Sequence, residues 1–100
     1  MKSLRADEDH AEDLEDYLAK QKGLRHLRIR RRADTLTLQS GPTDDPCPHA
    51  RFRRVSVHLW VLEMPNHTGR WEPTPYRDTL ENLAKTLVKS FPWAVAPVEG

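Results

Sequence analysis

The feature that most constrains the fold is a two-residue alternation of side-chain character that runs from Arg51 to Met64. The odd positions hold Val55, Val57, Leu59 and Val61, and the even positions hold Arg54, Ser56, His58, Trp60 and Leu62. Because successive side chains of a strand point to opposite faces, this alternation predicts a central β-strand. One of its faces is expected to be aliphatic and to join the core, and the other to be mixed and open to a partner.

Helical spacing occurs on both sides of this strand. The first predicted helix runs over Asp9–Lys22, with acids near its start and Gly23 after its end. The second begins at Asp78, which is expected to cap it with Glu81 three residues later. Its apolar stripe has helical periodicity and comprises Leu80, Leu83, Ala84, Leu87, Val88 and Phe91.

The remaining strands are predicted from shorter alternations. Apolar and basic residues alternate from Leu24, and threonine alternates with leucine over Thr35–Gln39, so a turn near Arg31–Asp34 makes a β-hairpin. Leu36 and Leu38 are expected to face inward. The Gly41–Pro48 segment, with three prolines, is predicted to be a loop. A short return strand over residues 70–72 is expected to stop at Pro73.

Together these elements predict the fold class: a single two-layer α+β domain in the order α-β-β-β-β-α. The sheet is expected to be an antiparallel meander with both helices on one face. The domain spans residues 1–100, with flexible ends allowed for at 1–8 and 94–100. Within the second of these ends, the run from Trp93 to Val98 is apolar enough to be expected to pack against the domain.

The composition of the chain limits the cellular compartments in which the protein is expected. No apolar run approaches the ~20 residues of a membrane span, and the first 23 residues are charged rather than signal-like. The single cysteine, Cys47, cannot form an internal disulfide, which suits a reducing compartment. We therefore expect a cytoplasmic protein with no membrane partner.

The charges are unevenly distributed, although the net charge is only +1. Seven acids fall within Asp7–Asp16, whereas arginines crowd the middle of the chain. Of the 16 cations, 11 are arginine, which favours bidentate recognition of phosphate or carboxylate. The asymmetry indicates either a basic surface for a polyanion or internal pairing of the arginines with the acidic helix.

The predicted binding site is the sheet face opposite the helices. Guanidinium groups two residues apart on a strand lie ~6.6–6.8 Å apart, close to the repeat of phosphates along a nucleic-acid strand. A neighbouring tryptophan would offer a stacking platform for bases. The predicted site residues are Arg28, Arg30, Arg32, Arg54, His58 and Trp60. Thr35, Thr37 and Gln39 are expected on the same face.

The alternative is a module that binds another protein through the same face or through the apolar tail. The partner would be either an acidic protein or a second copy of this chain. Catalysis is less favoured, and no cofactor is expected. Cys47 with His49 lacks the paired spacing of a zinc site. Asp44, Asp45 and Glu63 would suit a metal-dependent nuclease, but Met64 and Pro65 stand where a lysine often follows the glutamate.

The half of the chain from Pro48 to Phe91 also resembles a known family. The run His49-Ala-Arg-Phe-Arg-Arg-Val, then Leu59-Trp60, Gly69-Arg-Trp71, Pro73 and a final helix are similar to a small bacterial domain family of uncharacterised function. The resemblance implies a single α+β domain and no known activity. The element order is also similar to that of the double-stranded-RNA-binding domain, but the second helix lacks that family's basic N-terminal lysine cluster.

Overall fold

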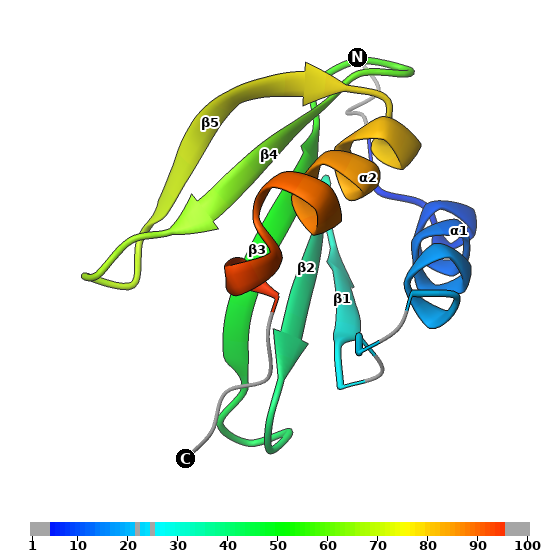
Figure 1. Ribbon diagram of the computed structural model, residues 1–100. Helices are drawn as coiled ribbons and strands as arrows, with labels where there is room; N and C mark the ends of the chain where they lie inside the picture. The colour runs from blue at the N-terminus through cyan, green and yellow to red at the C-terminus, as the bar shows by residue number, and fades with distance from the viewer. Residues whose placement is uncertain (1–4, 22, 25, 96–100) are drawn as a thin grey trace.

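The computed structural model describes residues 5–21, 23–24 and 26–95 (Figure 1). Its elements in chain order are α1 (Glu8–Ala19), β1 (Arg28–Arg32), β2 (Thr35–Ser40), β3 (Cys47–Arg54), β4 (Trp60–Pro65), β5 (Trp71–Asp78), α2 (Leu80–Ser90) and the 3₁₀ turn η1 (Pro92–Ala94). Within the described ranges, no helix is long and apolar enough to cross a membrane.

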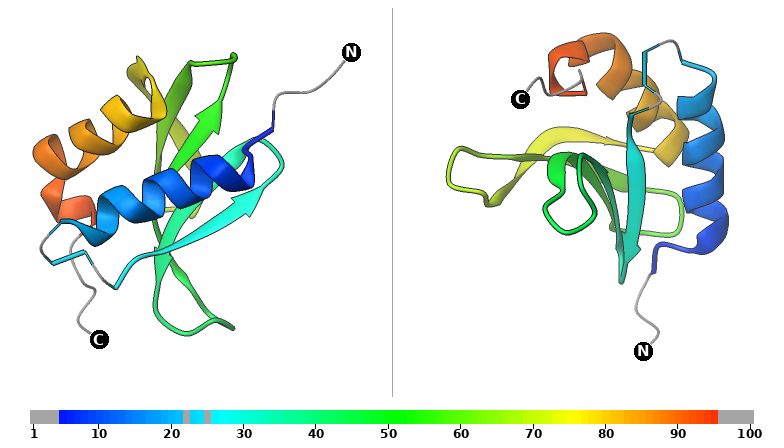
Figure 2. Two further views of the ribbon diagram at one scale, coloured as in Figure 1. Left: turned by 90° about the vertical axis from the view of Figure 1, so that its right-hand side faces the viewer. Right: turned by 90° about the horizontal axis from the view of Figure 1, so that it is seen from below.

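The five strands form one sheet in the order β1-β2-β3-β4-β5, and each neighbouring pair is antiparallel. Both helices pack on the same side of this sheet, which curls around them (Figure 2). The prediction of an α+β domain with an antiparallel meander and a helix at each end is confirmed. The sheet has five strands instead of the four expected.

The fifth strand arises because the predicted central strand is in fact a hairpin. β3 ends at Arg54 and β4 begins at Trp60, and these two residues pair across the turn. Within the turn, the N–H groups of Val55 and Ser56 both donate to the carbonyl of Leu59. The turn contains valines and neither glycine nor proline. Because strand-forming residues continue through the turn, the sequence pattern does not indicate a turn at this point.

The hairpin also reverses the predicted faces. Val55 and Val57, expected in the core, are 39% and 57% exposed in the turn. The even residue Trp60 is instead 2% exposed and packs in the core. The inward face of the sheet consists chiefly of Leu36, Leu38, Ala50, Phe52, Trp60 and Leu62, and α1 and α2 cover it with Leu14, Leu18, Leu80, Leu83, Ala84 and Leu87. Leu36 and Leu38 are buried as predicted.

Thr79, rather than Asp78, is the N-cap of α2. Its Oγ1 accepts the backbone N–H of Asn82 at 3.3 Å. Asp78 supports this cap, because its Oδ1 accepts from the Asn82 side-chain amide at 3.1 Å and from the Thr79 N–H at 2.7 Å. These two hydrogen bonds, that of the Asn82 side chain first, lower the pKa of Asp78 below its ordinary value of 3.8.

The lowered pKa makes a prediction about acid stability. Ionised Asp78 favours the folded state, so its contribution is present above the unfolded pKa and is lost as the pH falls through the lowered folded pKa. Asp78→Ala should therefore lower the urea midpoint at pH 7, and the difference from the original chain should shrink as the pH falls below 3.8. A difference that keeps the same size as the pH falls would contradict this role.

Both edges of the sheet are unsuited to pairing with another strand. β5 is longer than the predicted return strand and includes Pro73 and Pro75, which an edge strand tolerates because its outward side needs no N–H donor. β1 at the other edge carries four arginines among its five residues. Proline and charge on edge strands discourage sheet extension between molecules.

The ends of the described chain pack against the domain. Ala6 is 0% exposed and Val95 is 2% exposed. Two histidines hold the C-terminal end: a ring nitrogen of His26 lies 2.8 Å from the carbonyl of Val95, and Nδ1 of His49 lies 2.8 Å from that of Ala94. Of the segments 1–8 and 94–100, for which flexibility was allowed, residues 1–4 and 96–100 lie outside the described residues.

Candidate functional site

The sheet face turned away from the helices carries ordered rows of arginine and threonine. In the register of the strands, Arg30 pairs with Thr37, which pairs with Arg51. The next row repeats this pattern with Arg32, Thr35 and Arg53. We call these the two Arg-Thr-Arg rows. In each row, a threonine of β2 is paired between an arginine of β1 and an arginine of β3. The Thr35 hydroxyl donates to the backbone carbonyl of Arg32 at 2.8 Å.

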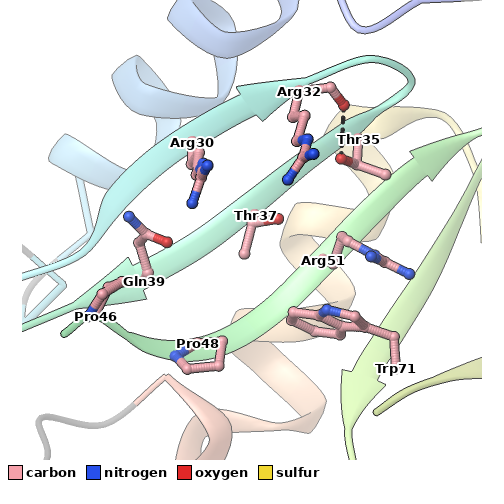
Figure 3. Close-up of a pocket in the computed structure, with 9 residues that line it drawn as sticks. All are labelled: Arg30, Arg32, Thr35, Thr37, Gln39, Pro46, Pro48, Arg51 and Trp71. Carbon is pink, nitrogen blue, oxygen red and sulfur yellow. Dashed lines mark hydrogen bonds between the residues drawn. The ribbon is translucent and has the colours of Figure 1, made fainter. Parts of the chain in front are cut away.

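A groove of about 240 Å³ lies over these rows, and we call it the outer groove. Its lining residues are Arg30, Arg32, Thr35, Thr37, Gln39, Pro46, Pro48, Arg51 and Trp71. Figure 3 shows Arg30 and Arg32 on one side, the two prolines and Trp71 on the other, and Thr37 between them. None of these nine residues carries a carboxylate, an imidazole or a thiol. The lining offers hydrogen-bond donors and cations, which suit an anion.

Arg51 is held in a defined position at this groove. Its Nε donates to Oε1 of Glu63 at 2.7 Å, and its guanidinium lies over the Trp71 ring, 4.7 Å from the ring centroid. The other oxygen of Glu63 lies 3.1 Å from a guanidinium nitrogen of Arg53. One carboxylate thus faces two guanidinium groups and leaves them with a net positive charge. Nε of Arg53 is buried and finds no hydrogen-bond partner among the described residues.

Replacing Glu63 by glutamine is expected to lower the free energy of unfolding by about 1–2 kcal/mol. The Glu63 side chain is only 3% exposed, so the two guanidinium groups lose a buried partner. Solvent reduces the cost, because the Arg51 and Arg53 side chains are 23% and 41% exposed. Urea denaturation followed by circular dichroism measures the change.

The control for this variant is Glu81→Gln, which breaks the exposed pair between Glu81 and Lys85 at 3.4 Å. It should change the free energy of unfolding by less than about 0.5 kcal/mol. An equal cost at both positions would show that Glu63 contributes no more than a surface ion pair.

The arginines of β1 carry charge that the described part of the chain does not neutralise. Arg28, Arg30 and Arg32 are exposed, and within residues 5–21, 23–24 and 26–95 none of them forms a salt bridge. Among the arginines that the structure describes, the acidic segment Asp7–Asp16 reaches only Arg54, through Asp7 at 3.9 Å. Pairing with the described acidic residues therefore does not account for the arginines of β1.

The predicted site residues divide into two groups. Arg28, Arg30 and Arg32 lie on the outer face as expected, whereas Trp60 is a core residue whose ring packs edge-on against His10 at 5.1 Å. The expectation that Trp60 is exposed beside the arginines is wrong, because the β3–β4 turn places it on the inner face. Arg54, which pairs with Trp60, also lies on the inner face of the sheet.

The other two predicted residues lie at the β3–β4 turn. Arg54 donates to the carbonyls of Ser56 and Val57 and, at 2.8 Å, to that of Arg5, so it ties the turn to the N-terminal segment. His58 is exposed in the same turn and does not line the outer groove. These contacts give Arg54 a structural role.

Three residues that are central to the candidate site were not predicted as site residues: Arg51, Arg53 and Trp71. The groove-lining residues Pro46 and Pro48 were predicted only as part of a loop. A usable signal exists for Arg51 and Arg53, because Phe52 between them indicates that even residues of this strand point inward and the arginines outward. Trp71 lies 20 residues further along the chain than Arg51. Its place beside Arg51 depends on β3, β4 and β5 lying next to one another.

The residues considered for catalysis have other roles or positions. His49 is 5% exposed, with its second ring nitrogen 2.7 Å from Oγ of Ser40. Glu63 is held by two arginines, while Asp44 and Asp45 lie in the loop between β2 and β3. Among the described residues, no three His, Cys, Asp or Glu side chains are grouped to hold a metal ion.

Comparisons with known proteins return no match: no family model, no curated protein and no solved structure is significantly similar to this chain. The resemblance to a small bacterial domain family therefore stays a prediction. The fold and the site define a small α+β domain with an arginine-lined groove on the open face of its sheet.

Proposed function

We propose that this protein is a binding module that holds the phosphate groups of a polyanion, nucleic acid first among them, in the outer groove. The observation that carries this proposal is the pair of Arg-Thr-Arg rows, in which Arg30 and Arg32 are exposed and without an acidic partner among the described residues. Phosphate oxygens accept from guanidinium groups in bidentate fashion and from hydroxyl groups.

The spacing of the rows supports repeated phosphates. Adjacent rows are two residues apart along β1, which corresponds to ~6.8 Å. The two arginines of one row lie two strands apart, which corresponds to ~9.6 Å between their backbones. A phosphate between Arg30 and Arg51 can therefore contact a guanidinium from either side while the Thr37 hydroxyl donates from below. In the second row the Thr35 hydroxyl already donates to the Arg32 carbonyl at 2.8 Å, so Arg32 is the residue of that row that offers N–H donors to the groove. Two rows side by side provide for two successive phosphates.

The fixed position of Arg51 favours a role in binding a ligand over a role as an ordinary solvent-exposed side chain. A solvated arginine keeps its rotamer freedom, which costs up to ~2 kcal/mol to restrict when a ligand binds. Glu63 and Trp71 already restrict Arg51, through the 2.7 Å hydrogen bond and the stacked indole. Binding an anion there costs less entropy, because the guanidinium is largely oriented beforehand.

The test is the affinity of the full chain for polyanions as a function of salt. A fluorescein-labelled single-stranded oligonucleotide, titrated with protein in anisotropy measurements, should bind at ~50 mM salt and be released as the salt concentration rises. Two phosphate contacts, one for each row, predict a slope of roughly −1.4 in a plot of log affinity against log salt. Absence of binding at low salt, or affinity that salt does not change, would refute the proposal.

A second candidate function, contact with a protein partner, is favoured by a different surface. Tyr76 and Trp93 are 42% and 70% exposed, and Phe91 packs edge-on between them, 5.5 Å and 5.9 Å from their ring centroids. Exposed aromatic groups are enriched at interaction hot spots. If a second copy of the chain is the partner, light scattering should show dimers at high protein concentration that Trp93→Ala abolishes. A monomer throughout would exclude the homodimer.

A further inference from the structure

The two sides of the outer groove differ in chemistry. Arg30 and Arg32 on β1 form a cationic side, whereas Pro46, Pro48 and Trp71 form an apolar and aromatic side (Figure 3). The floor between them carries hydroxyl and amide groups from Thr35, Thr37 and Gln39. Trp71 helps to orient Arg51, but phosphate groups by themselves would contact the cationic side and the polar floor and leave the two prolines and the open part of the indole without a partner. The asymmetry indicates a ligand that has an anionic edge and a flat apolar edge.

From this asymmetry we infer that the ligand is single-stranded nucleic acid, with its phosphates along β1 and a base against Trp71. The inference rests on the proposed polyanion-binding function and names its ligand. In a single strand, backbone phosphates and unpaired bases are exposed together, so both sides of the groove can be occupied at once. In a duplex the base faces are stacked on one another, and only base edges and phosphates are accessible.

The position of Trp71 fits this role. Arg51 lies over its ring and Trp71 lines the groove while only half-buried, so part of the indole stays open to a ligand. The Arg51 guanidinium, itself fixed by Glu63, limits rotation of the indole. The groove volume of about 240 Å³ is below the ~300 Å³ typical of small-molecule sites, so it has room for roughly one base at a time.

The experiment is isothermal titration calorimetry of the full chain with three probes: a 12-residue thymidine oligonucleotide, a duplex of equal length and inorganic polyphosphate. The original chain should bind the single strand more tightly than the duplex. Trp71→Ala should weaken single-strand binding by roughly 5- to 100-fold, the usual effect of losing a stacked base. Its affinity for polyphosphate, which has no bases, should change by less than about fivefold, because only the contact with Arg51 is lost and an exposed cation–π contact is worth up to ~1 kcal/mol.

Trp71→Phe is the matched variant, because it keeps an aromatic ring for stacking and for Arg51. It should retain most of the single-strand affinity, and circular dichroism verifies that both variants are folded. A parallel loss of single-strand and polyphosphate binding in Trp71→Ala would show that Trp71 only positions Arg51, and would overturn the inference. Equal affinity for duplex and single strand would also overturn it.

Both of those outcomes leave the proposed function standing, because the protein would still bind phosphate groups through its arginines. Failure of the original chain to bind any of the three probes at low salt would instead refute the proposed function, and the inference with it. Selective loss of single-strand binding in Trp71→Ala, with polyphosphate binding retained, is the result that the structure predicts.

Discussion

Replacing Arg30 and Arg32 together by glutamate is expected to weaken binding of a single-stranded oligonucleotide by at least about 100-fold at low salt. Each arginine belongs to one Arg-Thr-Arg row and faces the groove, so the double variant removes a guanidinium from both rows and adds repulsion. Anisotropy titrations at a series of salt concentrations measure the loss. The slope of log affinity against log salt should also become shallower, since fewer phosphates are contacted.

The matched control is the double variant Lys85→Glu and Lys89→Glu on α2. Both lysines are exposed on the helical layer, and the control changes the net charge of +1 by the same −4. At ~0.1 M salt, its binding should change by less than about tenfold, because charges are screened beyond ~10 Å. An equal loss in the control would mean that total charge governs binding. Retained binding in the arginine variant would refute the outer groove as the site.

Replacing Trp60 by alanine is expected to cost about 3–5 kcal/mol of stability. Trp60 is 2% exposed, belongs to the core shared by the sheet and both helices, and packs against His10 of α1. Domains of this size have only about 5–15 kcal/mol of stability, so much of it would be lost. Thermal unfolding followed by circular dichroism should show a midpoint lower by more than about 10 °C.

Trp93→Ala is the control for this prediction, because Trp93 is 70% exposed and its loss should change stability by about 0.5 kcal/mol or less. The prediction also separates two roles for Trp60. A tryptophan that contacts a nucleic acid directly would leave the midpoint unchanged when replaced and would weaken binding alone. That outcome would place Trp60 on the surface and contradict the packing of the core.

The parts of this fold that could be predicted from the sequence are those with a local period. The stripe of α2 and the alternation of leucine with threonine in β2 place Leu83 and Leu36 in the core without knowledge of the rest of the chain. The same alternation places Arg28, Arg30 and Arg32 of β1 on the opposite face. For these elements, burial follows from the spacing of a few neighbouring residues.

The parts that could not be predicted depend on a turn and on long-range register. No glycine or proline marks the turn after Arg54, so the alternation suggests one long strand and reverses the faces of Val57 and Trp60. An error of one residue in strand parity exchanges every inward side chain for an outward one. The contact between Arg51 and Trp71 depends on β3, β4 and β5 lying side by side in the sheet. A pattern of neighbouring residues does not contain this information.

The central claim, that a nucleic-acid strand binds in the outer groove, is tested most directly by the indole N–H signals of the three tryptophans in NMR spectra. Trp71 lines the groove, Trp60 lies in the core and Trp93 is exposed beside α2. Titration with a single-stranded oligonucleotide should shift the Trp71 signal and leave those of Trp60 and Trp93 in place. A shift of Trp93 with Trp71 unchanged would contradict the account.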